Sequence, residues 1–439
     1  MEKRKVRRVW LIVAVAVCVS IVLGVLFTSA IPDDQITNLD NASIMISFCG
    51  PYDKYSGFGL HNTLFYFYDS DGSVVDSYME NETVSDFCAV EGGNKTFLFF
   101  KNHSVVASQE ETVKLDNSSG TTLTYPSFSP SEVGYIEELD VAYALLNVGR
   151  LPESDEYINI VRFTSSDKSY DVILPYFIDD ISYDESERTF VCWINRVTFS
   201  EEYRGASALC VTLEYNPVNG EFIKGDTFKL TNPIGHAGTE LFSFVLAKDK
   251  MLYVVSNRML SSAEFEYPER MYLDIYDLSN HTLVEQKVLL DCYDGGKYGH
   301  GVMSGINSKP SLEQNGTLYV FTSDFQVIAV SGASSIEYYS MPFVFEDSRE
   351  RYNPQDTDVR TDFSGSAVSV GSDGRIYVLN LYPDNLVKIH QLNEDGSYEL
   401  FWEGICPFVA SLGYKIRGFE ILNIDPVVSE SVSRLPELM

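Results

Sequence analysis

The sequence has little positive charge. Its 439 residues contain 32 Lys and Arg against 63 Asp and Glu, which gives a formal net charge of −31. Proteins that bind nucleic-acid backbones need clustered Lys and Arg to neutralise phosphates, so this composition excludes nucleic acid as a partner. The acidic excess is typical of a well-hydrated surface, and it leaves a divalent cation or a cationic partner as alternatives.

The sequence also lacks the motifs of the common enzyme classes. It has no G-x-S-x-G nucleophile motif after a strand, no P-loop, and no Gly-rich dinucleotide fingerprint in the required context. None of its 7 cysteines has C-x-x-C spacing, and 6 histidines make a three-histidine metal site hard to assemble. These absences favour a protein that binds rather than catalyses.

One long apolar run is present, near the N-terminus. Basic residues within 1–8 precede an uncharged stretch over 9–30, which as a helix would span roughly 33 Å and cross a hydrocarbon core of about 30 Å. The basic flank predicts a cytoplasmic 1–8, a transmembrane signal anchor over 9–30 and a linker over 31–42. The rest of this single-pass membrane protein would then lie outside the cell. Cleavage near Ala30, which would release a secreted domain, is the alternative.

Beyond residue 30 the pattern is that of β-structure. No amphipathic helix longer than two turns stands out, and short runs of Val, Ile, Tyr, Phe and Leu alternate with Gly, Asn, Asp and Ser. Four of these runs align, each with an apolar stretch before an Asn, then a variable loop, an alternating strand, a polar turn and a further strand. The aligned runs are VAYALLNVGR, FVCWINRVTF, LYVVSNRMLS and RIYVLNLYPD.

Units of four strands that recur every 40–65 residues or so resemble the β-propeller superfamily over residues 43–423. The resemblance implies an all-β ring of four-stranded blades, which we count as seven, with six or eight as alternatives. No WD dipeptide, kelch glycine pair or Asp-box recurs, so it extends to no particular propeller family. We expect 415–423 (KIRGFEILN) to close the ring against the N-terminal strands and 424–439 to form a flexible tail. The innermost strands are placed near Ser43, Val84, Glu132, Asp179, Leu241, Gly301 and Ser366.

In a propeller, connections between the second and third strands emerge on the same face as the connections between blades. Binding loops grow on one face while scaffold turns stay short, so long connections indicate the functional face. Three consecutive units have such long second-to-third connections, at 149–156, 196–207 and 256–269.

Arg150, Arg196 and Arg258 stand at matching starts of these three connections. Guanidinium groups bind carboxylates and phosphates through paired hydrogen bonds, so the arrangement predicts an anionic ligand on this face. The alternative is that each arginine pairs with an acidic residue of its own loop.

His236 and His300 each follow a glycine and each precede a predicted innermost strand. This position predicts imidazoles near the mouth of the central channel, where they would bind a ligand or transfer protons. The alternative is a structural role within their own blades.

Calcium is the one cofactor with any support. Asp356, Asp358 and Asp362 cluster in the connection 346–365, and oxygen-rich clusters suit Ca²⁺. The string Asp69, Asp71 and Asp76 is a second candidate, although its Asp-Gly pair is already a sufficient hairpin signal. Neither has a full calcium-binding loop, so we expect no cofactor.

Cys192 and Cys210 fall on consecutive strands of one unit and are candidates for a disulfide. A bridge would need Cα atoms about 4.4–6.8 Å apart. Buried free thiols are the alternative.

The expected function is a membrane-tethered, extracytoplasmic propeller that binds or scaffolds a protein, a glycan or a small anionic ligand. The alternative is an extracytoplasmic enzyme, a hydrolase or lyase that acts on a glycan or a carboxylate at the channel mouth. Fold class does not choose between them.

Overall fold

The protein is represented by a computed structural model. The structure describes residues 36, 39, 41–50, 62–82, 88–108, 111–117, 129–150, 157–194, 208–231, 239–259, 269–291, 293–294, 297–298, 311–322, 326–340, 366–371, 373–381, 386–393, 397–405 and 415–422.

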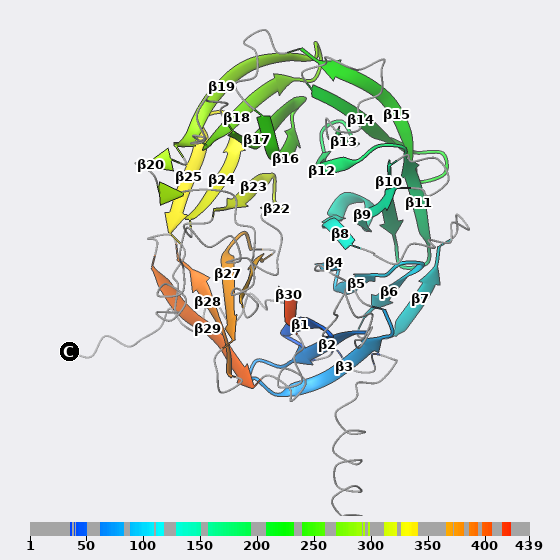
Figure 1. Ribbon diagram of the computed structural model, residues 1–439. Coiled ribbons are helices and arrows are strands. Elements are labelled where there is room, and N and C mark those ends of the chain that lie inside the picture. Colours follow the sequence, from blue (N-terminus) through cyan, green and yellow to red (C-terminus); the bar gives the residue numbers. More distant parts are fainter. Residues whose placement is uncertain are drawn as a thin grey trace, which may run out of the picture.

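Seven four-stranded antiparallel sheets stand around a central axis like the blades of a propeller (Figure 1). In blades 2 to 7 the strands follow one another in sequence order from the axis to the rim. The predicted all-β propeller and its blade count are therefore confirmed. Besides these blades, the described residues contain a 3₁₀ turn, η1 (Glu137–Leu139), and a small hairpin of β20 (Tyr293–Asp294) and β21 (Lys297–Tyr298).

The strands of blades 1 to 4 are β1 (Ile44–Cys49), β2 (Thr63–Tyr68), β3 (Val74–Glu80) and β30 (Lys415–Ile421); β4 (Ala89–Gly92), β5 (Lys95–Phe99), β6 (His103–Ala107) and β7 (Thr112–Asp116); β8 (Ser129–Ile136), β9 (Val141–Arg150), β10 (Tyr157–Thr164) and β11 (Ser169–Leu174); and β12 (Ile178–Asp184), β13 (Thr189–Ile194), β14 (Ala208–Asn216) and β15 (Glu221–Leu230).

The strands of blades 5 to 7 are β16 (Thr239–Lys248), β17 (Met251–Met259), β18 (Glu269–Asp277) and β19 (Thr282–Asp291); β22 (Ser311–Gln314), β23 (Thr317–Phe321), β24 (Gln326–Gly332) and β25 (Ser335–Ser340); and β26 (Ser366–Val370), β27 (Ile376–Leu381), β28 (Leu386–Leu392) and β29 (Tyr398–Ile405).

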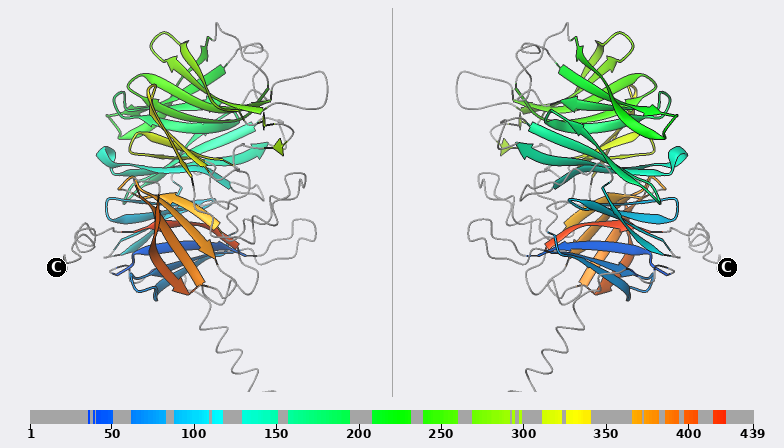
Figure 2. Two further views of the ribbon diagram at one scale, coloured as in Figure 1. Left: turned by 90° about the vertical axis from the view of Figure 1, so that its left-hand side faces the viewer. Right: turned by 90° about the vertical axis from the view of Figure 1, so that its right-hand side faces the viewer.

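Blade 1 joins the two ends of the chain. β30 pairs antiparallel with β1, with Ile421 opposite Ile44, and becomes the innermost strand (Figure 2). The predicted closure by 415–423 is confirmed. The prediction of an innermost strand near Ser43 is wrong, because β1 is the second strand of its blade. The predicted positions hold for β8, β12, β16 and β26, whereas β4 and β22 begin later than expected.

Apolar side chains pack between the blades. Between blades 3 and 4, for example, the ring of Phe222 lies 4.6 Å from Phe163 and 5.1 Å from Phe190, between ring centroids. Burial of such rings is the main stabilising contribution here, as in other propellers built of stacked sheets.

A polar zipper joins blades 4 and 5 beside the axis. The inner edge of β16 has backbone N–H groups with no strand to pair with, and such groups need a partner when buried. Alternate side chains of β12 point to one side of the sheet and accept hydrogen bonds from these N–H groups. The N–H of Val245 donates to Asp180 (2.8 Å) and that of Ala247 to Ser182 (2.7 Å), and in the turn after β16 the N–H of Lys250 donates to Asp184 (2.8 Å).

The predicted segments 1–8 and 9–30 and the tail 424–439 lie outside the described residues. Within the part of the chain that is described, no helix has the length and apolar character needed to cross a membrane. The anchor stays a prediction. Part of the linker 31–42 does pack on the propeller, because Ile36 and Leu39 are buried in the core shared by blades 1 and 2.

Candidate functional site

Most of the predicted site lies outside the described residues: Arg196, His236, His300, Asp356, Asp358 and Asp362. Arg150 is the last residue of β9, opposite Tyr157, and only its backbone is described. The predicted convergence of three arginines and the roles of the two histidines therefore stay predictions. Arg258 is the member of the set whose side chain can be followed.

Arg258 is not a loop residue, as the sequence had suggested. β17 continues to Met259, and Arg258 is 1% exposed. It shares a face of the sheet with Val254, four residues earlier, which packs in the core between blades 4 and 5. The arginine is therefore held between two blades.

The ion-pair partner that the structure describes for Arg258 comes from the neighbouring strand, and the loop 260–268 lies outside the described residues. Nη2 donates to the carboxylate of Asp274 on β18, whose side chain is also 1% exposed. The guanidinium lies over the ring of Tyr272, 4.8 Å from the centroid. Gln286 on β19 donates to the other oxygen of Asp274 at 2.8 Å. The arginine is thus fixed through Asp274 and one stacked ring.

The rest of the guanidinium is unpartnered. An arginine carries five N–H donors. Nε and Nη1, which hold three of them, have no hydrogen-bond partner in the structure as described. The hydroxyls of Ser256 and Ser243, which face each other in register on β17 and β16, also lack partners among the described residues. Native proteins rarely leave such groups unsatisfied, and each instance needs an explanation.

The facing side of blade 4 offers these groups little. Its core side chains are apolar or weakly polar, namely Val191, Trp193, Ala208, Cys210 and Leu230, and its polar Asp180 and Ser182 already accept backbone N–H groups of β16. Electrostatic interactions are stronger beside such a surface than in water. An additional anion held here would interact strongly with the guanidinium.

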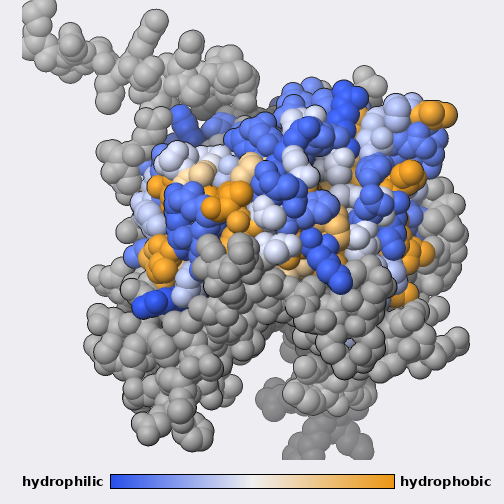
Figure 3. Space-filling view, turned by 90° about the horizontal axis from the view of Figure 1, so that it is seen from above, coloured by the Kyte–Doolittle hydropathy of each residue, from blue (hydrophilic) through white to orange (hydrophobic). Residues whose placement is uncertain are grey.

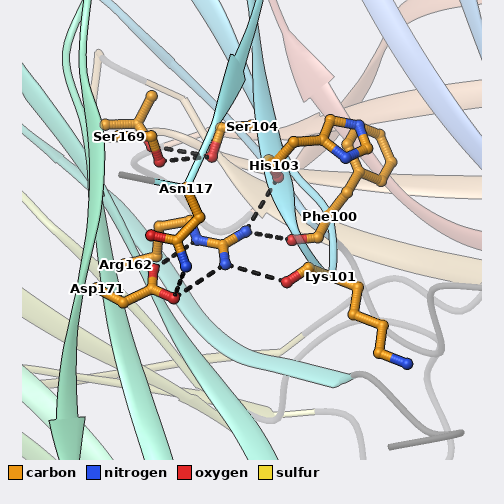
Figure 4. Close-up of polar contacts among 9 residues, drawn as sticks. Phe100, Lys101, His103, Ser104, Asn117, Arg162, Ser169 and Asp171 are labelled. Carbon is orange, nitrogen blue, oxygen red and sulfur yellow. Dashed lines mark hydrogen bonds and ion pairs between the residues drawn. The ribbon is translucent and has the colours of Figure 1, made fainter. Parts of the chain in front are cut away.

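A second buried arginine in the chain is fully satisfied (Figure 4). Arg162 on β10 binds Asp171 on β11 through both oxygens, at 2.7 Å from Nε and 3.1 Å from Nη2. Its remaining donors reach the backbone carbonyls at the β5–β6 turn of blade 2, those of Phe100, Lys101 and His103. All five N–H groups are used, which leaves none for a ligand.

The hydroxyls next to Arg162 are satisfied as well. Thr164 donates to Ser104 at 2.9 Å, and Ser169 lies within hydrogen-bond distance of both, at 3.2 and 3.4 Å. Figure 4 shows Ser104 and Ser169 beside the arginine, between the strands of blades 2 and 3.

The two arginine sites differ in the length of one connection in the blade that each arginine faces. The β5–β6 turn of blade 2 spans only residues 100–102, so its carbonyls lie directly against Arg162. The corresponding connection of blade 4 spans 195–207 and lies outside the described residues. The sequence signal was the long connection itself. The partners Asp274 and Gln286 were missed, because only the strand register reveals them.

Blades 1 and 2 meet through carboxylates. Tyr78 and His103 both approach one oxygen of Glu80, at 2.7 and 3.1 Å. Burial alone would raise the pKa of Glu80, but these hydrogen bonds outweigh it and lower the pKa to about 2. At the inner edge, burial first and the charge of Glu91 second raise the pKa of Glu420 to about 8. Glu420 is therefore largely protonated in the folded protein at neutral pH.

The string at Asp69 forms a turn. One oxygen of Asp69 accepts the backbone N–H of Asp71 at 3.0 Å and of Ser73 at 2.8 Å, and Gly72 adopts φ 81°. A side chain at Gly72 would collide with the carbonyl oxygen of Glu403 in blade 7. The turn reading is confirmed. Within the described ranges, no three His, Cys, Asp or Glu side chains are grouped to hold a metal ion.

The predicted disulfide is wrong in this structure. Cys192 and Cys210 are both buried and free. The strand register sets Cys192 opposite Val211 and Cys210 opposite Trp193, so the two thiols occupy successive positions and face opposite sides of the sheet. Burial raises the pKa of both thiols, which suits inert core residues.

Apolar side chains on the outer rim are scattered. The view in Figure 3 shows small apolar areas separated by hydrophilic ones over the described surface. The more exposed apolar residues belong to several outer strands and turns, among them Val218, Ile223, Val284, Val288, Tyr338 and Ile405. This rim does not present a continuous aromatic surface in the part of the chain described.

No protein-family model matches this chain, and no curated protein matches its sequence. Solved structures resemble it in fold. A hypothetical selenium-binding protein from Sulfolobus tokodaii is 10% identical, with a TM-score of 0.46, over 89% of this chain and 94% of that one. The propeller domain of the Trilobed protease from Pyrococcus furiosus is 9% identical, with a TM-score of 0.36, over 78% and 82%. The WD40 domain of Neurospora crassa Pan2 is 9% identical, with a TM-score of 0.36, over 79% and 85%.

Likenesses this distant say nothing of function. The class is defined by the seven sheets themselves: this is a seven-bladed β-propeller closed by its C-terminal strand.

Proposed function

We propose that this protein is a ligand-binding propeller that recognises a small anionic group between blades 4 and 5, through Arg258. The observation that supports this most is the set of unpartnered N–H donors on a guanidinium that is 1% exposed. A buried donor without a partner costs free energy, and an anion that accepts these hydrogen bonds would recover it.

The charge pattern supports the same proposal. Arg270 lies directly opposite Arg258 in the register of β17 and β18, so two guanidinium groups start from one face of the sheet. Two cationic side chains in neighbouring positions favour an anionic over a cationic ligand in a chain that is otherwise strongly acidic.

The site is built to hold its shape. The zipper from β12 to β16 fixes the two blades beside the axis, and Asp274 with Tyr272 fixes the guanidinium. A preorganised donor loses little entropy on binding, which favours affinity for a small ligand. No described residue favours the enzymatic alternative, whose histidines lie outside the described part.

The test is calorimetric titration of the full chain with acetate and with inorganic phosphate, repeated with Arg258→Lys. Lysine keeps the charge but loses the planar pair of donors. Loss of such charge-assisted hydrogen bonds corresponds to about 1.5–3 kcal/mol, so we expect affinity to fall roughly 10- to 150-fold. Arg375→Gln, which changes an arginine whose side chain is 51% exposed, is the matched control and should bind like the wild type.

The proposal fails if neither anion binds, or if Arg258→Lys binds both as well as the control does.

The membrane tether and the extracytoplasmic location are also proposed, from the sequence of 9–30 alone. Protease added to intact cells is expected to remove the propeller. Survival of the propeller in intact but not in lysed cells would contradict this topology.

A further inference from the structure

We propose that the anion bound at Arg258 is a small 2-hydroxycarboxylate, whose carboxylate pairs with the guanidinium and whose hydroxyl bonds to Ser256 or Ser243. This inference rests on the proposed function and specifies its ligand.

The free donors suit a planar carboxylate. A guanidinium has two edges with paired parallel N–H groups, one formed by Nε and Nη2 and the other by Nη1 and Nη2. Asp274 engages Nη2, while Nε and Nη1 have no partner in the described structure. Whichever Nη2 hydrogen Asp274 takes, the other edge keeps two parallel N–H groups. Such an edge matches the two oxygens of one carboxylate.

The hydroxyls add a second requirement. Ser256 lies two residues before Arg258 on the same face of β17, and Ser243 is its direct cross-strand neighbour on β16. Ser256 is 0% and Ser243 2% exposed, and neither hydroxyl has a hydrogen-bond partner among the described residues. These two hydroxyls lie next to Arg258 on the same face of the sheet, so they would bond a polar group close to the ligand's carboxylate. A hydroxyl on the carbon that carries the carboxylate meets this requirement.

Burial limits the size of the ligand. Arg258, Ser256 and Ser243 are each at most 2% exposed, and the facing core of blade 4 is apolar apart from Asp180 and Ser182 of the zipper. A compact acid such as glycolate or lactate fits these limits better than a glycan chain. Phosphate would present its oxygens tetrahedrally and has no hydroxyl placed on an adjacent carbon.

The site at Arg162, called filled here because every N–H of the guanidinium has a partner, is completed by the protein itself. There, the turn of blade 2 supplies acceptors to the guanidinium, and Thr164, Ser104 and Ser169 satisfy one another. The site at Arg258 has the same kinds of groups without these partners. A hydroxycarboxylate could supply the partners that these groups lack, through its carboxylate to the guanidinium and its hydroxyl to a serine.

The experiment compares glycolate, acetate and inorganic phosphate by calorimetric titration of the full chain, in the wild type and in Ser256→Ala and Ser243→Ala. One additional hydrogen bond corresponds to roughly a 2- to 12-fold change in affinity. We expect glycolate to bind at least threefold more tightly than acetate or phosphate. At least one of the two alanine variants should bind glycolate and acetate alike, with acetate affinity unchanged. Ser104→Ala, which alters a hydroxyl in the filled site, should keep the preference for glycolate.

If phosphate or acetate binds as tightly as glycolate, or if both alanine variants keep the preference, the hydroxycarboxylate inference is overturned while anion binding at Arg258 stands. If no anion binds in an Arg258-dependent way, the proposed function falls and this inference with it.

Discussion

Two buried arginines in one ring have opposite surroundings. Arg162 faces blade 2 and uses all its donors on Asp171 and three backbone carbonyls, whereas Arg258 faces blade 4 and, among the described residues, bonds through Nη2 alone, to Asp274. Both start from the same type of sheet, and both face the preceding blade. At Arg162 the difference comes from the β5–β6 turn of blade 2, whose carbonyls accept from the guanidinium, whereas the corresponding connection of blade 4 lies outside the described residues.

The comparison teaches how a repeated scaffold acquires a site. A buried Arg–Asp pair is tolerated when its remaining donors find acceptors, and it is then part of the structure. Where the described residues offer no such acceptors, as at Nε and Nη1 of Arg258, the donors could serve the anion proposed above. A ligand site in this propeller would therefore form where buried donors have no acceptor from the protein itself.

The largest expected effect comes from removing the arginines. Arg162→Met should lower the free energy of unfolding by about 3–5 kcal/mol, because it removes five hydrogen bonds from buried acceptors and leaves the Asp171 carboxylate with Asn117 but without its cation. Arg258→Met should cost less than half as much, since it removes one hydrogen bond and leaves Asp274 bonded to Gln286. Denaturant unfolding of the two variants measures both. Equal losses would contradict the contrast between the two sites.

A pH dependence at a third interface should be the next largest effect. The pKa of Glu420 is raised from 4.5 to about 8, so between these values the folded form binds a proton that the unfolded form has lost. The stability contribution of this group therefore falls as pH rises from about 4.5 to about 8. Glu420→Gln removes the effect and should stabilise the protein by about 1–3 kcal/mol at pH 9 but not at pH 4.

Unfolding curves of Glu420→Gln and wild type at these two pH values decide this prediction. If Glu420→Gln raised the free energy of unfolding equally at pH 4 and pH 9, the charge of Glu420 would have no effect on stability.

The zipper between blades 4 and 5 should contribute to a similar or smaller extent. Asp180→Ala leaves the buried N–H of Val245 without its acceptor and should cost about 1–3 kcal/mol. Asp180→Asn retains an acceptor oxygen and should cost less, measured by denaturant unfolding. If alanine and asparagine cost the same, the hydrogen bond to β16 contributes nothing and the interface is held by apolar packing alone.

The smallest effects should still separate the two arginine sites. Ser104→Ala removes a hydroxyl that is bonded to Thr164 and should cost about 0.5–1.5 kcal/mol. Ser256→Ala removes a buried hydroxyl without a partner and should leave stability unchanged or raised by a few tenths of a kcal/mol. Thermal unfolding in anion-free buffer compares them. A loss in Ser256→Ala equal to that in Ser104→Ala would mean that its hydroxyl is satisfied by the protein.

Much of the ring could be read from the sequence. The alternation of apolar strands with polar turns reports burial on both sides of each blade, and KIRGFEILN was recognisable as an unpaired strand that closes the ring. The exception was β1, because a strand that enters the ring second in its blade looks the same in sequence as one that enters first. Position within a blade depends on which distant strand arrives beside it.

The site was predicted in part, for a physical reason. In LYVVSNRMLS, the polar Ser-Asn-Arg sequence resembles the start of a loop, yet these residues continue β17 because Asp274 offsets the charge of Arg258. That carboxylate comes from another strand and is found only through the register. The same holds for Cys192 and Cys210, whose spacing allowed a bridge that a one-residue difference in register excludes.

The most direct test of the difference between the two arginines is a crystal structure of the full chain grown with glycolate. We expect a carboxylate bound at 2.7–3.0 Å to two nitrogen atoms of Arg258, with none at Arg162. The contradicting result is a guanidinium whose Nε and Nη1 are already bonded to the protein's own chain, for instance to Glu240 across the strand pair, with no glycolate between blades 4 and 5.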